Sequence, residues 1–599
     1  MPAYLLRSEV QQESTEQLLA QLESELAECG HVNPTGLNHL KAFMVECGIW
    51  HISELDYTLR EEYERQLRME YVDSTCRRYL LAYDRVKQHS IKKNFQVISR
   101  GRTVYPPYEN TLLYLPYHPN PKIAKRFEIS VKKEELRWDF TLAAPERMKR
   151  QMYSILHYAI ETETDNDRFR KCLVMLQLLY SACVKTQTED IEGLELDQVQ
   201  RLMQTLSARR LCGKLNKAIE YSRRALFMKA EEINWKADVW YLERMHIQPE
   251  RMNPSNPVKR ISFLEVRNKT NRDLLKQYMK YGFGITNLTI GNLRAEMNYI
   301  RRFLMGVDGY EIGDVRELSP SQIDRYLKDM QERKPKPATY NRFVMSILHF
   351  YQFLQARRYI ERIPFCEDYY IKKEIPQHHD RSVDADVAAE IFEKLAMFPE
   401  EIRLMYLHLW GVGLRISEIC TLKGDAYYIQ GRDAWIQVYQ TKMKRYKRIP
   451  IPDALYKLMR VYIRKHRIRE KDYVFQNHEG GPYNSGTFRY NMKRYCRIAD
   501  IQNGDYRFQA HDYRHTLASY FYSNGVSLQG VRDYLGHTYE EMTLQYIDFM
   551  PKKVEKANAE YFSSKKSLAS CLRKGVKQDE KQDLSENLAL LLNSNRKPT

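Results

Sequence analysis

The residues best suited to chemistry gather in residues 511–546, HDYRHTLASYFYSNGVSLQGVRDYLGHTYEEMTLQY. His511 and Arg514 are three residues apart, His537 follows a Leu-Gly step, and Tyr546 comes nine residues later. Guanidinium and imidazole groups bind phosphate oxygens, and a phenol can act as a nucleophile. This combination favours a site that stabilises a phosphate while a hydroxyl attacks it.

Two upstream segments add charged residues to this set. GVGLRISEICTL places Arg415 and Glu418 one helical turn apart, and the basic segment TKMKRYK supplies Lys442. The set contains neither a carboxylate pair nor a group of metal ligands. Each His or Tyr taken alone is more often a packing residue than a catalyst, so the hypothesis depends on the joint pattern.

The elements around these residues are predicted from capping signals. His511 and Arg514 lie at the start of a helix, on one face. Ser527 can cap the next helix, and Gly536 is placed to end it in the left-handed conformation. His537 then sits at a sharp turn, and a further short helix carries Tyr546.

The segment before this region mixes helices and strands. Helical patterns run through DADVAAEIFEKL and EEIRLMYLHLWGVGLRISEICTL, after which AYYIQ, DAWIQVYQ and KRIPIP are typical of strands. TKMKRYK between the last two is predicted to form a hairpin turn. The tail, residues 564–599, has a charged spacer and one short apolar helix, which we expect to dock on another surface.

A weak internal repeat marks the first 365 residues. ISELDYTLREEYERQL, IEGLELDQVQRLMQTL and VRELSPSQIDRYLKDM each have a β-branched residue, Leu three positions on and Leu or Met fifteen positions on. Each is followed by a basic, aromatic-rich helix. The pattern predicts two packed amphipathic helices whose outer face carries Arg, Lys and Tyr. A chance resemblance remains the alternative for the first two copies.

Composition sets the class of protein and of partner. The chain has 599 residues, which indicates three to five domains, and 43% apolar with 29% charged residues favours a folded chain. A net charge of +18 favours a polyanionic partner, nucleic acid before a membrane surface. No apolar run is long enough to span a bilayer, the N-terminus lacks a signal-peptide core, and the ten cysteines are dispersed, so we expect a cytoplasmic protein.

Four segments carry a family resemblance. GLRISEICTL, TKMKRYKRIPI, HDYRHTLASY and DYLGHTYEEMTLQY resemble, in the same order, the motif blocks of the tyrosine recombinases of the phage-integrase type. The resemblance covers about residues 380–563, and about residues 265–365 resemble the family's core-binding domain. The first 260 residues have no such match.

The resemblance implies the fold and five segments. The fold would be mainly α with a small antiparallel β-sheet, in which helical N-terminal domains precede a tyrosine-recombinase catalytic domain. The segments are an N-terminal helical domain that is a possible core-binding-like repeat, a second helical region with a Pro/Tyr-rich loop, the core-binding domain, the catalytic domain and the tail: 1–100, 101–260, 261–366, 380–563 and 564–599. MNPSNPVKR, residues 252–260, is predicted to be a linker.

The resemblance also implies a role for each candidate. Tyr546 would attack the scissile phosphorus to form a 3′-phosphotyrosyl link and release a 5′-hydroxyl, while Arg415 and Arg514 bind the non-bridging oxygens. His537 would add a third donor, and His511 would accept or relay the tyrosine proton. Because the bond energy stays in the ester, neither ATP, nor a metal, nor another cofactor is implied.

The role of the hairpin cations is open. Lys442 resembles the lysine that protonates the leaving 5′-oxygen, since it stands eight residues before Pro450 as in the family. The alternative is that any hairpin cation only contacts backbone phosphates: Lys442, Lys444, Arg445, Lys447 or Arg448. Glu418 is expected to orient a catalytic side chain.

The implied partner is double-stranded DNA, bound by a homo-tetramer on two duplexes, with companion recombinases of a bacterial mobile element and a location at the nucleoid. The basic N-terminal helices are expected to contact DNA, or else to form solvated faces. Two other functions stay open, a catalytically silent DNA-binding accessory protein and a topoisomerase-like DNA relaxer.

Overall fold

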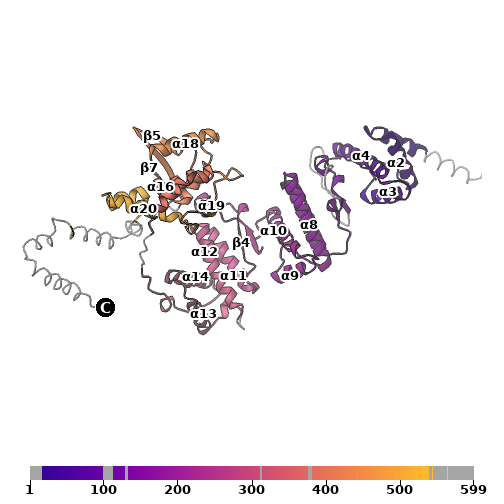
Figure 1. Cartoon of the computed structure of the whole chain (residues 1–599). Coiled ribbons are helices and arrows are strands. Elements are labelled where there is room, and N and C mark those ends of the chain that lie inside the picture. Colours follow the sequence, from indigo (N-terminus) through magenta and orange to yellow (C-terminus); the bar gives the residue numbers. More distant parts are fainter. Residues whose placement is uncertain are drawn as a thin grey trace, which may run out of the picture.

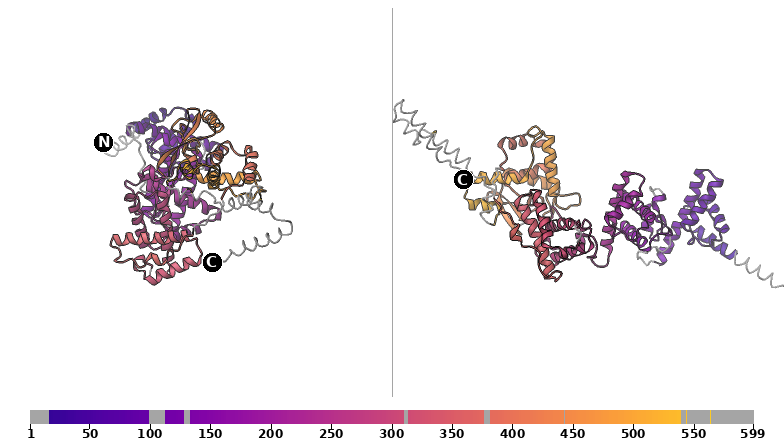
Figure 2. Two further views of the ribbon diagram at one scale, coloured as in Figure 1. Left: turned by 90° about the vertical axis from the view of Figure 1, so that its left-hand side faces the viewer. Right: turned by 90° about the horizontal axis from the view of Figure 1, so that it is seen from below.

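The computed structural model describes residues 16–98, 112–127, 133–309, 313–375, 381–441 and 443–538, together with residues 543 and 563. Three helical units follow one another along the chain and lead into a mixed C-terminal domain. Figure 1 and the right-hand view of Figure 2 show units one and two one after the other, to one side of the rest. Lys442, Tyr546 and the whole tail, residues 564–599, fall outside the described residues.

Unit one comprises helical residues 16–27 and three longer helices, α2 Pro34–Glu46, α3 Tyr57–Glu70 and α4 Asp73–Ile98. Side chains of Asn33 and Asp56 accept hydrogen bonds from the first backbone N–H groups of α2 and α3, which fixes where these helices begin. Apolar faces of all four helices meet in one core around Leu40, Phe43 and Tyr63.

Unit two contains α7 Glu146–Thr162, α8 Asn166–Thr186, α9 Leu196–Gln204, the 3₁₀ turn η3 Arg209–Leu211 and α10 Cys212–Lys229. Short elements precede it: β1 Leu112–Tyr114, η1 Leu115–Tyr117, α5 Pro121–Ala124, η2 Lys125–Phe127, α6 Lys133–Leu136 and β2 Arg137–Asp139. Strands β1 and β2 pair antiparallel, with Leu113 opposite Trp138. The Pro/Tyr-rich stretch, residues 101–121, forms one short strand and turns over its described part.

Unit three contains α11 Lys269–Gly284, α12 Ile290–Val307, η6 Val315–Glu317, α13 Pro320–Glu332 and α14 Pro337–Ala356. Between units two and three lie β3 Val239–Tyr241, η4 Leu242–Arg244, η5 Pro249–Arg251 and β4 Arg260–Ser262, and β3 pairs antiparallel with β4. Phe227 of α10 and Trp240 of β3 share one hydrophobic core with unit three. The two units are therefore joined through packed side chains.

The internal repeat is present in all three units, and it is larger than predicted. Each unit has four helices, and its second helix packs against its fourth. Two amphipathic helices alone would leave apolar faces in water, which the first two helices of each unit cover. The repeat motif is the buried pair before the third helix and the cap that follows: Ile52, Leu55 and Asp56; Ile191, Leu194 and Glu195; Val315, Leu318 and Ser319.

The C-terminal domain surrounds a three-stranded antiparallel sheet in the order β5-β6-β7. Two strands match the predicted segments, β5 Tyr427–Gln430 and β6 Asp433–Gln440. The third, β7 Arg445–Pro450, begins two residues earlier than predicted, so residues 445–447 of the predicted hairpin turn belong to a strand. Helices and turns complete it: η7 Glu367–Tyr369 before the domain, then α15 Ala385–Glu393, η8 Leu395–Met397, α16 Glu400–Val412, α17 Ile416–Cys420, α18 Asp453–Lys465, α19 Ser485–Ile498, α20 Ala510–Ser523 and α21 Leu528–Leu535. The prediction of a mainly helical fold with small antiparallel sheets is confirmed.

Residues 252–260, which the sequence predicts to be a linker, are mostly exposed but are anchored at Ser255. Ser255 is fully buried, and its carbonyl oxygen accepts a hydrogen bond of 2.9 Å from the backbone N–H of Ser485 at the start of α19. Arg251 donates to three carbonyl oxygens near the end of α11, those of Gly282, Phe283 and Leu288. The segment therefore links unit three to the C-terminal domain.

Within the described residues, no helix has both the length and the apolar character that crossing a bilayer requires.

Candidate active site

Glu418 is the buried centre of the site. It lies at the third position of α17, and Arg415 is the residue before that helix. The carboxylate accepts one hydrogen bond from the backbone N–H of Arg415 at 3.0 Å and one from Arg415 Nη1 at 2.9 Å. Both the start of α17 and the direction of the Arg415 guanidinium are fixed by this one side chain.

Gly413 makes the turn between α16 and α17. Its φ of 64° is left-handed, and a Cβ atom there would lie 2.7 Å from Leu517 Cδ2 of α20. Only glycine allows this φ without strain and this close approach to α20. The turn directs the Gly413 carbonyl oxygen toward Arg514, whose Nη1 donates to it at 2.8 Å.

Arg514 is buried, with 1% of its surface exposed, and joins two turns. Besides Gly413, its guanidinium donates through Nη2 to the carbonyl oxygen of Leu535 at the end of α21, at 2.5 Å. The same Nη2 lies 3.1 Å from His537 Nε2. The start of α20 and the two glycine turns are thus held together by one planar cation.

His537 follows the left-handed Gly536, as the capping signals predict, and is buried. An arginine N–H can only donate, so His537 Nε2 must accept from Arg514, and the ring proton is assigned to Nδ1. Nδ1 lies 3.0 Å from Thr543 Oγ1, which can accept that proton's hydrogen bond. The imidazole is therefore neutral and oriented on both sides.

Lys447 is the hairpin cation that reaches this centre. On β7 the side chains of Lys447 and Ile449 face the core, and Lys447 Nζ lies 3.6 Å from Glu418 Oε2. A surface contact with backbone phosphates, which was one alternative for this residue, does not fit a side chain that is 7% exposed. The alternation of buried and exposed residues along β7 could have shown this from the sequence.

Gln440 belongs to the site and was not found by sequence reasoning. It is buried on β6, in line with Ile436 and Val438, and its Nε2 donates to Glu418 Oε1 at 3.2 Å. The same atom lies 3.4 Å from the Leu535 carbonyl oxygen. An apolar alternation that ends in a buried glutamine was the available signal.

The pKa values of Glu418 and Lys447 move in the directions expected for this cluster. Burial opposes ionisation of Glu418, but the positive charges of Lys447, Arg514 and Arg415 outweigh it and lower the carboxyl pKa to about 2. Burial lowers the pKa of Lys447 to about 8, although Glu418 favours its charged form. One carboxylate thus stabilises three cations.

Both candidate histidines are neutral at pH 7. Burial and the charges of Arg514, Arg415 and Lys447 lower the pKa of His537 to about 3. Desolvation lowers the pKa of His511 to about 4, together with His515 and the nearby arginines. A neutral imidazole can accept a proton, which suits the role expected of His511.

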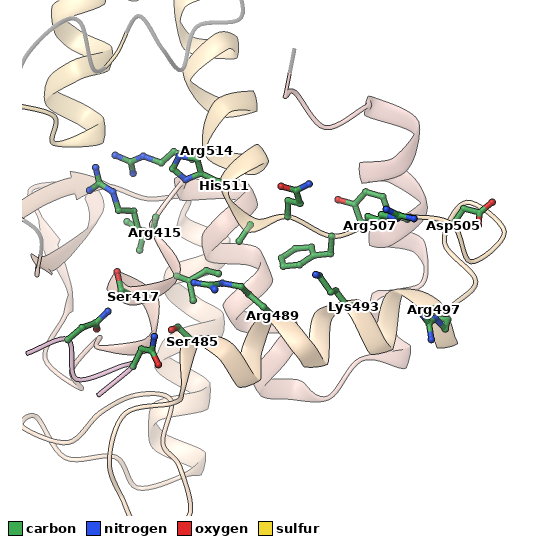
Figure 3. Close-up of a pocket in the computed structure, with 18 of the residues that line it drawn as sticks. Arg415, Ser417, Ser485, Arg489, Lys493, Arg497, Asp505, Arg507, His511 and Arg514 are labelled. Atoms are coloured by element: carbon green, nitrogen blue, oxygen red, sulfur yellow. The ribbon is translucent and has the colours of Figure 1, made fainter. Parts of the chain in front are cut away.

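A cavity of about 1050 Å³ opens at these residues. Arg415, His511 and Arg514 lie together at one end, as Figure 3 shows, and α19 runs along the wall. The other lining cations are Arg489, Lys493, Arg497 and Arg507, and the segment 253–256 contributes Asn253 and Asn256. The cavity is therefore a strongly basic groove.

Four of the six candidate residues are brought together in the described structure. Arg415, His511 and Arg514 line the groove, and His537 joins them through its contact with Arg514. The roles of Lys442 and Tyr546, which lie outside the described residues, rest on the sequence.

The C-terminal half of the chain is similar to known proteins. A family model described as the phage integrase family matches residues 381–552. Transposase B from transposon Tn554 of Staphylococcus aureus is 28% identical over 326 residues, which cover 52% of this chain and 51% of that protein. A tyrosine recombinase of Thermosipho africanus is 24% identical and is covered over 94% of its length, against 46% of this chain.

Two solved structures are also similar to part of this chain, at low TM-score and low sequence identity. One is the XerH site-specific recombinase bound to palindromic difH substrate, with TM-score 0.38, 14% identity and coverage of 49% of this chain and 83% of that chain. The other is the Tn1549 transposon integrase with transposon right end DNA, with TM-score 0.36, 16% identity and coverage of 49% and 100%. This chain spans about half the length of the Tn554 transposases that it matches. Residues 381–552, where the motif residues gather, thus match the phage integrase family of tyrosine recombinases.

Proposed function

We propose that this protein cleaves and rejoins double-stranded DNA through a 3′-phosphotyrosyl intermediate, as the recombinase of a mobile element. The observation that carries the proposal is the pairing of two fixed guanidinium groups, Arg415 and Arg514, at one end of the basic groove. Glu418 and two backbone carbonyl oxygens orient them before any substrate binds. Preorganised cations of this kind stabilise charge that develops on a phosphate in the transition state.

The first chemical step forms one bond and breaks another. The Tyr546 phenolic oxygen attacks the phosphorus, the bond from phosphorus to the 5′-oxygen breaks, and the 3′-phosphotyrosyl ester remains. The phenol proton passes to His511, which is neutral above about pH 4 and can accept it. Rejoining reverses these transfers, with a new 5′-hydroxyl as the nucleophile.

The leaving 5′-oxygen takes its proton from Lys442 in this proposal. Lys447 is the other lysine near the site, but it is buried against Glu418 and holds that carboxylate in place. Its position suits support of Arg415 better than a contact with the leaving group. The buried Lys447 thus favours Lys442 as the proton donor.

His537 acts as a donor only after a change of protonation. In the structure its Nε2 accepts from Arg514, so a phosphate oxygen at that nitrogen requires a proton there. A bound phosphate adds negative charge beside the ring and favours the protonated form. Substrate binding and the third phosphate contact are therefore coupled.

The similarity to Tn554 transposase B supports a transposon recombinase, and the letter B in the name of that relative marks it as one member of a set. We infer action with companion recombinases and assembly as a tetramer on two duplexes. The solved structure of a lambda integrase dimer bound to a core site is a relative's example of assembly on DNA.

Covalent trapping tests the proposal. Wild type, Tyr546→Phe and the control Tyr520→Phe, whose ring is 61% exposed on α20, are incubated with nicked duplex from the ends of the encoding element. We expect a denaturation-resistant adduct with wild type and with the control, and none with Tyr546→Phe.

Two results would overturn the proposal. Specific binding of the same duplex without an adduct for any variant would identify an accessory DNA-binding protein. Relaxation of supercoiled plasmid at random positions, without recombinant products, would identify a DNA relaxer. The companion recombinases of the element are then added to the reaction. An adduct that appears only with them shows that a partner was missing, and no adduct even with them shows that the activity is absent.

A further inference from the structure

Unit two carries an exposed basic surface at the connection between its third and fourth helices. Arg209 and Arg210 form η3, Lys217 lies in the second turn of α10, and all three side chains are exposed. In the described part of this unit, ion pairs engage other arginines, such as Arg201 and Arg224, but none of these three residues. Their positive charges therefore face solvent without an ion pair among the described residues.

The same surface recurs in unit three at the same register. Glu195 and Ser319 begin the third helices of the two units, and each makes a capping box with a Gln three residues later. Fourteen and fifteen residues after the cap stand Arg209 and Arg210 in unit two, and Arg333 and Lys334 in unit three. The two exposed pairs thus occupy equivalent positions.

The third cation is equivalent as well. In α10, Lys217 precedes the buried Ala218 and Ile219, and in α14, Arg342 precedes the buried Phe343 and Val344. Both Lys217 and Arg342 are exposed. The third cation stands 22 residues after the cap in unit two and 23 residues after the cap in unit three, and in each unit it is the sixth residue of the fourth helix.

Unit one shows that the fold itself does not require these charges. Fourteen and fifteen residues after its cap Asp56 stand Glu70 and Tyr71. Only Arg78, which precedes the buried Tyr79 and Leu80, matches the third position. A basic surface that two units share and the third lacks indicates a common ligand rather than a packing rule.

Units two and three are held in a fixed relation. Arg272 of α11 is buried and donates to Glu195, the cap of α9, at 2.8 Å, and to Asp238 at 3.2 Å. Lys276 also pairs with Asp238 at 2.8 Å. Contacts between the units that involve buried charges and a shared apolar core keep the two basic surfaces together.

We propose that unit two is a second duplex-binding module, which holds the DNA backbone through Arg209, Arg210 and Lys217 on a stretch flanking the one held by unit three. The inference rests on the proposed function, because it takes DNA as the ligand of unit three. Arginine and lysine on an exposed turn bind phosphate oxygens and release condensed counterions, a mode that reads no base sequence. The occupied DNA would then extend beyond the site of cleavage.

Three charge-matched triple variants of the full chain test this. The first is Arg209→Gln, Arg210→Gln and Lys217→Gln, the second is Arg333→Gln, Lys334→Gln and Arg342→Gln, and the control changes three exposed cations of α8, Arg168→Gln, Lys171→Gln and Lys185→Gln. Binding of a labelled mixed-sequence duplex of about four helical turns, roughly 40 base pairs, is measured by fluorescence anisotropy over a salt series. Circular dichroism confirms that each variant is folded.

We expect the first and second variants to bind more weakly than wild type and the control to bind equally well. Each lost phosphate contact lowers the slope of log affinity against log salt by about 0.9, so loss of three contacts lowers it by up to about 3. On DNA from the element's ends, hydroxyl-radical protection should be lost on the outer flank for the first variant and nearer the cleavage point for the second.

A wild-type slope and footprint for the first variant, with a reduced slope for the second, would overturn the inference and leave the proposed function intact. Unchanged binding by both variants, with no covalent adduct in the trapping assay, would reject the proposed function itself. Preferential binding of single-stranded RNA of equal length by wild type, lost in the first variant, would also overturn the inference.

Discussion

At the scale of single residues, we expect Lys442 and Lys447 to have different roles: Lys442 donates a proton, and Lys447 holds Glu418 in place. Lys442→Ala should slow cleavage by about 10²- to 10⁴-fold, the usual contribution of a general acid. A substrate with sulfur in place of the bridging 5′-oxygen should restore the rate, because a thiolate leaves without being protonated.

Lys447→Met is the matched variant. Its defect would be misplacement of Glu418 and Arg415, so the sulfur substrate should not restore its rate. Rescue of Lys447→Met but not of Lys442→Ala would reverse the two assignments. Single-turnover cleavage of both substrates by both variants measures the difference.

The buried His537 predicts a pH dependence of stability. Its pKa is lowered to about 3 from the ordinary 6.5, so between these pH values the unfolded chain binds a proton that the folded chain does not. The free energy of unfolding should therefore fall as the pH is lowered from 6.5 toward 3. Urea unfolding at several pH values should give a flatter profile for His537→Asn, and an unchanged one for a control at the exposed His478. Equal slopes for wild type and His537→Asn would contradict this assignment.

At the scale of elements, the turn after α21 joins the sheet to the site. Gly536 has φ 71°, and a Cβ atom there would lie 2.5 Å from Gln440 Nε2. Gly525, after α20, has φ 86° but nothing within 4 Å of such an atom. Alanine substitutions at the two glycines therefore distinguish the cost of a left-handed φ, present at both, from the cost of a steric clash, present only at Gly536.

Gly525→Ala should cost about 1 kcal/mol or slightly more, the usual range for a non-glycine residue in this conformation. Gly536→Ala should cost more and should also slow cleavage, because Gln440 and His537 must move. Thermal unfolding and adduct formation of the two variants give the comparison. Equal losses in both would mean that the contact with Gln440 has no role.

The elements also show what the sequence could predict. Strand β6, the cap at Ser527 and the turn at Gly536 follow from local signals, and all three are present. Lys447 and Gln440 were missed as site residues because their role depends on which face of the hairpin is buried, and on a carboxylate more than twenty residues away. Local spacing carries no information about such partners.

The repeat was similarly visible only in part. The caps and buried pairs before the third helices follow one pattern. The first two helices of the units have no sequence pattern in common that predicts them. Packing of the second helix against the fourth, which completes each unit, is a tertiary contact. That each unit contains four helices could therefore be seen only in the structure.

At the scale of the whole molecule, the segment 253–256 bears on how substrate can arrive. The chain joins unit three to the C-terminal domain through residues 357–384, and the hydrogen bond between Ser255 and Ser485 joins the segment before unit three to the same domain. Asn253 and Asn256, on either side of Ser255, line the basic groove. A duplex in that groove would therefore lie against this second connection.

With this arrangement the protein could hold DNA by enclosing it as well as by affinity. If Ser255→Cys and Ser485→Cys are joined by a disulfide under mild oxidation after DNA is bound, with the other cysteines replaced by Ser, a circular plasmid should stay threaded in high salt. Linearising the plasmid should release it, because an open end can slide out of a ring. Release of the intact circle would show that the second connection does not enclose DNA. Enclosure would give the protein a means of staying on its DNA through the interval when a strand is cut.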